Sequence, residues 1–553
     1  MFAHKKIVAA KKAEREDRLN TVSSDYQGPI TPAEKTILNL EASEVISKVQ
    51  SGDVSAATVL HAYGKQTIAA QNHCNPVTEV MFGAPDRYAD KLAAKAKSGP
   101  LAGFPVSLKD TANVPGYDSC MGYSALAFKP AKTKGAIIQI LEDAGAVPFV
   151  KTNVPLTLLS FESYNDVWGN TENPHVAGYS SGGSTGGEAA LLAYGGSRLG
   201  VGTDVAGSVR VPAHYSGIYS LKCTSGRFPK AGNNTSMPGQ DGIPAVYSPM
   251  CRTLADLSFF TKVIIDMKPW NYDYTVTPLP WKEPELPAKL KIGLMATDTI
   301  TPLSPACERA LSMATEALRK QGHEIIEFVP PRAADALNIG TKLLTSDALK
   351  TCSKNIMWGG SNDNFVAYAK RWYSLPKFLK KIYVWWVRYV RKDPIWATLA
   401  DAAELTGSEF WQYVYQRETY KAEFYSKYKE SGIDYLITAP AATPAYPCYT
   451  GWSANAACLY TFLFNIVDYP AGIMPVTHVD KDKDQYPETF SLKKLNGVAK
   501  GVHRYYDPVK MHGLPVGVQV VGRRFDEEGV LAVMQKIYNG LEQMGQSYEL
   551  LNA

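Results

Sequence analysis

The sequence predicts an α/β fold in which helices cover both faces of a mixed β-sheet. Short apolar segments typical of strands alternate with longer segments of helical periodicity along most of the chain. Such alternation is typical of sheets whose strands are joined by helices. The composition is that of a globular protein, because 45% of the 553 residues are hydrophobic and 20% are charged. The chain can therefore bury a large core.

The predicted elements are spread over the whole chain. Residues 41–77 have helical periodicity, interrupted by a Ser-Gly-Asp break. A short strand at 104–108 ends at Lys109-Asp110, and the glycine- and serine-rich stretch 178–207 is still crossed by apolar runs. The remaining elements are helices at 136–144, 306–320 and 527–541 and strands at 146–150, 290–295, 323–328, 435–437 and 516–520.

The N-terminal 20 residues carry mixed charges and no apolar core. We expect an exposed helix there and no secretory signal, so that 1–35 forms an N-terminal helical extension of a domain at 36–553. This domain is expected to contain a variable, partly helical insertion at about 330–430. No apolar run approaches the roughly 18 residues that a membrane span needs.

Charge and cysteine usage argue against several classes of function. The net charge of +5 is small for this length and comes without a dense basic block, so no nucleic-acid partner is expected. The eight cysteines form no CxxC pair. This pattern favours reduced thiols in a cytoplasmic protein over a zinc site. We expect neither a metal nor an organic cofactor.

Three segments are candidates for a catalytic site: 107–110 (Ser-Leu-Lys-Asp), 182–188 and 202–210. Their dense glycines permit close backbone approach and positive φ, which a site can use to cradle a phosphate or to bind an oxyanion. Phosphate binding is disfavoured, because no lysine follows these glycines as in a P-loop. The run Gly200-Val201-Gly202 also lacks the third glycine of a dinucleotide-binding turn.

A competing interpretation concerns Ser184. The run Gly182-Gly183-Ser184-Thr185-Gly186 matches the nucleophile elbow of α/β-hydrolases. In that interpretation Ser184 is the nucleophile and needs a downstream histidine, for which His503 and His512 are available. Nothing in the surroundings of either histidine singles it out.

Together the three segments resemble the amidase signature family. Its long motif joins a Gly-Gly-Ser-Ser-Gly-Gly run to Gly-Thr-Asp-x-Gly-Gly-Ser-x-Arg-x-Pro, which residues 182–188 and 202–212 match with the family's spacing of 24 residues between the two serines. Leu108-Lys109-Asp110 matches the upstream motif. The likeness extends from about Glu41 to the C-terminal helix and is greatest to fungal-type acetamidases and fatty acid amide hydrolases, partly on residues 147–155. It implies the amidase-signature fold and the hydrolysis of amides.

The resemblance also assigns a role to each matching residue. Ser208 matches the nucleophile that forms the acyl-enzyme, Lys109 the base, and Ser184 the serine between them, which in the family follows a cis peptide bond. The backbone N–H groups of the turn match the oxyanion hole of the family, and this turn consists of Val205, Ala206, Gly207 and Ser208. The resemblance also leads us to expect that three further residues support the site, namely Asp204, Arg210 and Thr185. In two departures from the motif, Thr185 replaces a serine and Ala206 a glycine.

The chemistry places a demand on Lys109. A lysine is a base only when neutral, so its pKa must fall from about 10.4 to roughly 7–8. Burial can supply this shift, and Lys109 ends an apolar strand. Ser208, for its part, is too weak a nucleophile without an adjacent base.

The substrate is less well determined. Leu158, Leu159 and Phe161, together with Ser184, fall where the resemblance places the acyl-binding wall, although ordinary core packing explains these leucines equally well. We expect hydrolysis of small or aliphatic amides. Fatty acid amides or alkyl carbamates are alternatives at the same site. A glutaminase-type amidotransferase subunit and an inactive binding scaffold are weaker alternatives.

Residues 377–391 interleave aromatic and aliphatic side chains with basic ones. A basic helix with tryptophans can lie on a membrane surface, and the position resembles the membrane cap of fatty acid amide hydrolases. The same segment can equally pack onto its own domain or onto the second subunit of a homodimer. Peripheral membrane contact is therefore one expectation for an otherwise cytoplasmic protein.

Overall fold

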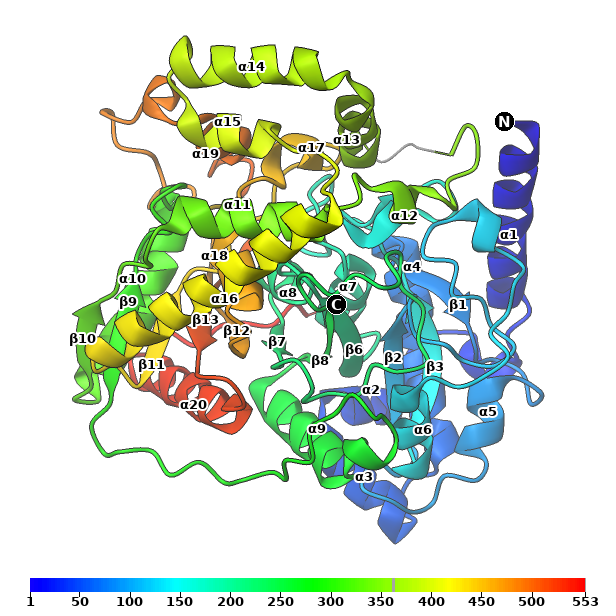
Figure 1. Ribbon diagram of the computed structural model, residues 1–553. Coiled ribbons are helices and arrows are strands. Elements are labelled where there is room, and N and C mark those ends of the chain that lie inside the picture. Colours follow the sequence, from blue (N-terminus) through cyan, green and yellow to red (C-terminus); the bar gives the residue numbers. More distant parts are fainter. Residues whose placement is uncertain (361–363, 553) are drawn as a thin grey trace.

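A computed structural model describes residues 1–360 and 364–552. Its centre is a mixed sheet of 11 strands (Figure 1), which confirms the predicted α/β class. The strands stand in the order β1 (Val77–Val80), β3 (Val147–Thr152), β2 (Pro105–Lys109), β6 (Leu199–Asp204), β8 (Val246–Cys251), β7 (Tyr219–Lys222), β12 (Ala471–His478), β13 (Pro515–Val521), β11 (Tyr435–Thr438), β9 (Lys291–Met295) and β10 (Glu324–Glu327). A separate ribbon pairs β4 (Tyr164–Asn165) with β5 (Gly169–Asn170).

Parallel pairs occupy two parts of this sheet. Strand β2 runs parallel to β3 and β6, and β9 runs parallel to β10 and β11. The pairs from β6 through β8, β7, β12 and β13 to β11 are antiparallel. Since β2 and β6 are parallel neighbours, their carboxyl ends, at Lys109 and Asp204, lie at the same edge of the sheet.

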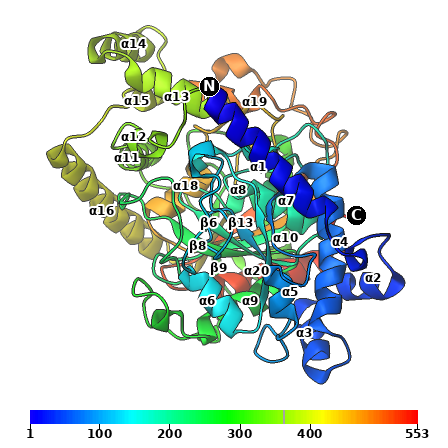
Figure 2. The same cartoon turned by 90° about the vertical axis from the view of Figure 1, so that its right-hand side faces the viewer.

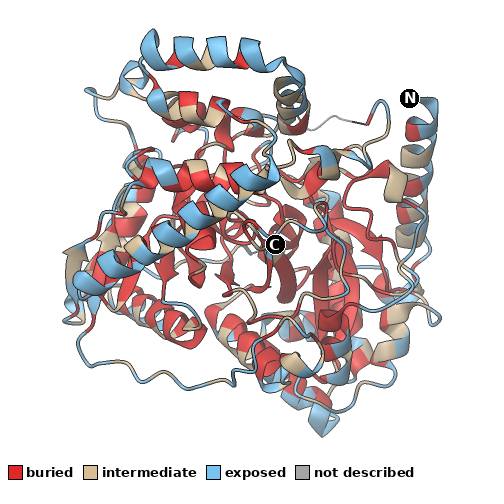
Figure 3. Ribbon diagram, in the orientation of Figure 1, coloured by how far each residue is buried: buried red, intermediate tan, exposed pale blue. Residues whose placement is uncertain are grey.

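Helices cover both faces of the sheet, as predicted. Figure 2 shows α7 (Gly186–Tyr194) and α8 (Arg210–Ser216) on one face and α6 (Ala136–Asp143), α9 (Leu254–Asp266) and α20 (Glu527–Gln543) on the other. The strands between them are buried (Figure 3). Further helices are α2 (Pro32–Asn39), α5 (Tyr88–Ala93), α10 (Pro305–Lys320), α17 (Gly451–Ala454), α18 (Leu459–Ile466) and α19 (Gly497–His503).

The Ser-Gly-Asp break in the first helical region has a local cause. Helix α3 (Ala42–Ser51) ends at Gly52, whose φ of +85° is readily adopted by glycine. Helix α4 (Ala56–Cys74) begins after Ser55, whose side chain accepts a hydrogen bond from the N–H of Thr58. The break is thus a C-cap followed by an N-cap.

The expected insertion at 330–430 is helical throughout much of its described length. Its helices are α11 (Ala333–Leu344), α12 (Lys350–Ser353), α13 (Asn364–Ser374), α14 (Lys377–Tyr389), α15 (Pro394–Ala400) and α16 (Gly407–Glu430). Helices α13 to α15 form an outer layer at the top of Figure 1, with α14 largely exposed (Figure 3). None of the helices in the described chain has both the length and the apolar run needed to cross a bilayer.

The N-terminal helix α1 (Phe2–Asn20) exists, and most of its residues are exposed or half-buried as expected, but three side chains on one face are buried. It lies against β1, and the side chains of His4, Lys11 and Arg15 are buried. Lys11 forms ion pairs at 2.7 Å with both Glu79 and Asp118. The helix therefore docks through polar groups, which apolar periodicity cannot reveal.

Candidate active site

The three glycine-rich or strand-end segments converge at the carboxyl edge of β2 and β6. Lys109 is the last residue of β2, Ser184 precedes α7, and Ser208 lies between the end of β6 and α8. The N–H of Thr185 donates to the carbonyl of Ser208 at 3.1 Å, which fixes the two serine segments against each other. Residues separated by up to 99 positions in the sequence thus form one site.

Lys109 is fully buried and surrounded by hydroxyl groups. Its Nζ donates to Oγ of Ser184 at 2.8 Å, to Oγ1 of Thr185 at 2.9 Å and to Oγ1 of Thr203 at 2.7 Å. Burial lowers the pKa of Lys109 to about 7, against the opposing charges of Asp204 and Glu188. A substantial neutral fraction therefore exists at neutral pH, as a general base requires.

The peptide bond between Gly183 and Ser184 is cis, as the family resemblance implied. No side chain fits at position 183, because a Cβ there would lie 2.3 Å from the carbonyl oxygen of Ser160 and 2.8 Å from the backbone nitrogen of Glu162. This close backbone approach explains why the motif needs glycine before its serine.

The turn that carries Ser208 is equally tight. Gly207 has a φ of +128°, and a Cβ on it would lie 2.3 Å from Oγ1 of Thr461. Ala206 has no positive φ, so its replacement of the motif's glycine is tolerated. The N–H of Gly207 donates to Oδ1 of Asp204 at 2.9 Å. That group is therefore engaged within the turn, and the oxyanion hole predicted at Val205, Ala206, Gly207 and Ser208 stays a prediction.

Asp204 and Arg210 hold this turn, in the supporting positions predicted for them. Arg210 is fully buried and donates from Nε to Oδ2 of Asp204 at 3.0 Å and from Nη2 to Oδ1 at 2.9 Å. Asn465 donates to Oδ1 as well, at 2.9 Å. Burial alone would raise the pKa of Asp204, but the adjacent Arg210 guanidinium outweighs it and lowers the pKa to about 2. The carboxylate stays ionised and accepts the N–H of Gly207.

A cavity of about 230 Å³ opens beside Ser208. The predicted wall residues Leu158, Leu159 and Phe161 line it, together with Val205 and Ala206 of the turn, whereas Ser184 is not part of the lining. Among the described residues, no acidic, basic or histidine side chain lines the cavity. Its surface is apolar and aromatic, with only hydroxyl, amide, thiol and indole groups as polar atoms.

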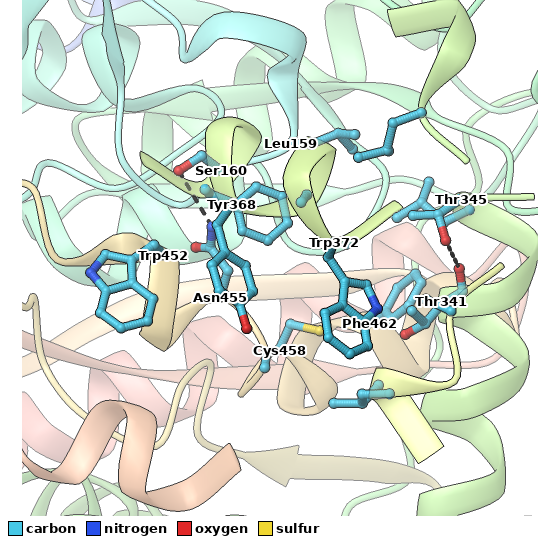
Figure 4. A pocket seen from close by; sticks show the side chains of 18 of the residues that line it. Leu159, Ser160, Thr341, Thr345, Tyr368, Trp372, Trp452, Asn455, Cys458 and Phe462 are labelled. Carbon is cyan, nitrogen blue, oxygen red and sulfur yellow. Dashed lines mark hydrogen bonds between the residues drawn. The ribbon is translucent and has the colours of Figure 1, made fainter. Parts of the chain in front are cut away.

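Much of this lining comes from helices that the sequence did not connect to the site. Figure 4 shows Tyr368 and Trp372 of α13 facing Trp452, Asn455 and Phe462. Tyr383 of α14, Trp396 of α15 and Thr341 and Thr345 of α11 complete that side of the cavity. No motif or spacing marks these residues, because the helices that carry them meet only in the folded chain.

The competing nucleophile-elbow interpretation finds no support in the geometry. His503 is bound by the hydroxyl of Tyr486 at Nδ1 and by the carbonyl of Pro302 at Nε2, 2.8 Å away. Nδ1 of His512 lies 3.0 Å from the carbonyl oxygen of Val479. The hydrogen-bonding partner of Ser184 is Lys109 and not a histidine.

Comparisons with known proteins identify the family of this chain. A family model described as Amidase matches residues 58–531. The acetamidase of Aspergillus oryzae is 30% identical over 536 residues, covering 93% of this chain and 92% of that protein. Fatty-acid amide hydrolase 1 of Sus scrofa is 32% identical over 510 residues, covering 91% and 86%. A solved structure of fatty acid amide hydrolase superposes with a TM-score of 0.83 at 27% identity, covering 97% of this chain and 96% of that one.

Proposed function

This chain belongs to the amidase family and is an amide hydrolase, and on that premise we propose that it cleaves carboxylic amides through an acyl-enzyme formed on Ser208. The observation that carries the proposal is the buried contact of Lys109 with Ser184, next to a Ser208 that faces the cavity. A base, a hydroxyl relay and a nucleophile are then assembled at one edge of the sheet.

The proposed reaction uses these groups in sequence. Neutral Lys109 accepts the proton of Ser184, which accepts that of Ser208 as the Ser208 oxygen attacks the amide carbon. The negative charge that forms on the carbonyl oxygen is stabilised by backbone N–H groups of the turn at 205–208. The relay then returns the proton to the departing nitrogen, and the C–N bond breaks. Water hydrolyses the resulting ester by the same route and frees the acid.

The cavity supports an aliphatic acyl group. It has room for roughly seven or eight groups of methylene size, if each occupies about the 30 Å³ that a water molecule takes up in the liquid. We therefore propose that aliphatic amides longer than acetamide bind best, with fatty acid amides and alkyl carbamates as alternative substrates of the same site. A glutaminase activity is disfavoured, because the charged groups of glutamine would be buried here without partners.

The test is hydrolysis of acetamide, hexanamide, oleamide and ethyl carbamate by the wild type, Ser208→Ala and His512→Ala. We expect turnover of at least one amide, its loss in Ser208→Ala, and unchanged activity in His512→Ala. Retained activity in Ser208→Ala together with loss in His512→Ala would contradict the proposal. An absence of turnover with the whole panel would instead favour a binding scaffold.

We also propose that helix α14 contacts a membrane surface. Its exposed face carries Phe378, Leu379, Ile382, Trp385, Trp386 and Tyr389, each at least 42% exposed, beside Lys377, Lys381 and Arg388. Exposed apolar and basic groups on one helix suit an anionic lipid surface.

Flotation with anionic vesicles at low salt tests this contact. The wild type and a Trp411→Glu control on α16 should float, and Ile382→Glu should not. If the wild type stays in the dense fraction, α14 has another role, such as contact with a second subunit.

A further inference from the structure

Glu162 is a buried carboxylate that joins two walls of the cavity. It is 5% exposed and directly follows Phe161, which lines the cavity. One of its oxygens accepts the N–H of Tyr449, and the other accepts the N–H of Gly451 at 3.3 Å. Among the described residues, no lysine, arginine or histidine forms an ion pair with it. Backbone N–H groups therefore stabilise its charge.

The backbone that Glu162 holds carries cavity-lining residues. Gly451 begins α17, and Trp452 and Asn455 of that region face the cavity. A second link runs parallel to the first, because the N–H of Phe161 donates to Oδ1 of Asn455 at 3.1 Å and Asn455 also contacts Ser160 (Figure 4). The wall at 158–161 and the wall at 452–456 are thus joined at two points.

The same segment touches the catalytic region. The backbone of residues 160–162 packs so closely against Gly183 that no Cβ fits between them. The carbonyl of Phe161 accepts a hydrogen bond from Ser180 at 3.2 Å, and Oγ of Ser163 donates to the carbonyl of Gly182 at 3.0 Å. A shift of this segment therefore alters both the shape of the cavity and the support of Ser184.

We infer that Glu162 is a positioning residue that fixes the acyl-binding walls through its two carboxylate oxygens. The inference rests on the proposed function. A carboxylate can accept both N–H groups, whereas a glutamine or a protonated glutamate turns one of these positions into a donor that faces an N–H group. One buried donor then loses its partner, and the wall at 452–456 keeps only its second link to the wall at 158–161, through Asn455.

Of Glu162 and the Cys448 and Tyr449 side chains next to it, only Glu162 has a pKa near neutral pH. Burial raises the pKa of Glu162 to about 7. The facing Cys448 thiol and Tyr449 phenol both have raised pKa values, through burial and the nearby carboxylates of Glu162 and Glu172, so both stay neutral there.

The experiment measures KM for hexanamide and for acetamide, whose short acyl group makes little contact with the walls. In the ratio of the two KM values, the protonation of Lys109 cancels. Glu162→Gln is compared with the wild type and with Glu172→Gln. Glu172 is a nearby carboxylate that does not line the cavity, and it accepts a hydrogen bond of 2.9 Å from the N–H of Gly178.

At pH 8 we expect the hexanamide-to-acetamide KM ratio to rise about tenfold in Glu162→Gln and to change less than about twofold in Glu172→Gln. In the wild type the ratio should rise as the pH falls through 7, and in Glu162→Gln it should not depend on pH. A ratio in Glu162→Gln equal to that of the wild type would overturn the inference.

If Glu162→Gln does not fold, the pH dependence of the wild-type ratio decides alone, and a constant ratio overturns the inference. The proposed function fails differently, since in that case the wild type hydrolyses no amide of the panel or Ser208→Ala keeps its activity.

Discussion

Replacing Thr203 with valine should shift the acid limb of the pH–rate profile to lower pH and leave its plateau unchanged. Oγ1 of Thr203 accepts a hydrogen bond from Nζ of Lys109 at 2.7 Å. This bond favours the ammonium over the neutral amine, because hydrogen bonds to charged groups are stronger. Valine keeps the shape of threonine but removes the acceptor. The pKa of Lys109 should therefore fall.

The size of the shift follows from hydrogen-bond energetics. A hydrogen bond contributes about 1.5–3 kcal/mol when one partner is charged and about 0.5–1.5 kcal/mol when both are neutral. The difference, about 1 kcal/mol, is slightly less than one pKa unit, which corresponds to about 1.4 kcal/mol. Because the pKa of Lys109 is about 7 and only its neutral form is a base, the half-maximal rate should move from about pH 7 to about pH 6.

The assay is kcat/KM for acetamide, whose short acyl group makes little contact with the walls that Glu162 holds, between about pH 5 and pH 9 in the wild type, Thr203→Val and Thr67→Val. Thr67 is a matched control, because it is buried and its Oγ1 donates to the carbonyl of Gly196 at 2.7 Å, outside the site. An unchanged or raised midpoint in Thr203→Val, or an equal shift in Thr67→Val, would show that the hydrogen bond from Lys109 to Thr203 does not set the pKa of Lys109.

Three further predictions concern stability and turn geometry. Lys109→Met should abolish turnover yet raise the free energy of unfolding at pH 7 by a few kcal/mol, since a pKa of about 7 instead of 10.5 costs the folded state about 5 kcal/mol, partly offset by the hydroxyls left unpaired. Between about pH 7 and 10.5 the unfolded wild type binds a proton at Lys109 that the folded wild type lacks, so the stability advantage of Lys109→Met over the wild type should shrink as the pH rises through that range. A lower free energy of unfolding in Lys109→Met than in the wild type, measured in urea at pH 7, would contradict this prediction. Gly207→Ala should lower kcat at least about 100-fold, because its Cβ would lie 2.3 Å from Oγ1 of Thr461, and near-normal kcat for hexanamide would contradict this. Lys11→Met should lower the free energy of unfolding by about 3–5 kcal/mol, because two buried carboxylates lose a partner at 2.7 Å; a change below about 1 kcal/mol in urea would contradict it.

The proposed catalytic groups could be located in the sequence because they lie in short local patterns that match the family motif. Lys109 ends an apolar strand, and the glycines beside Ser184 and Ser208 mark backbone that packs too closely for side chains. These features depend on a few consecutive residues, so the structure could be expected to bring them together, while their roles come from the family resemblance. The alternation of strands and helices identified the fold class for the same reason.

The cavity and the docking of α1 could not be predicted in this way. Trp372, Tyr383 and Trp396 lie more than 160 positions after Ser208 and line the cavity only because α13 to α15 fold over it. Lys11 looks like any surface lysine until Glu79 and Asp118 are placed beside it. Contacts between distant segments decide both features, and no spacing within either segment records them.

Mass spectrometry of the acylated protein shows directly whether Ser208 carries the acyl group. The protein is mixed with an activated ester of hexanoic acid, quenched in acid and digested with trypsin. Cleavage after Arg198 and Arg210 places Ser208 in the peptide 199–210 and Ser184 in the peptide that ends at Arg198. We expect the hexanoyl group on Ser208 in the peptide 199–210. A hexanoyl group on Ser184, or an unmodified peptide 199–210 while the ester is turned over, would contradict the account.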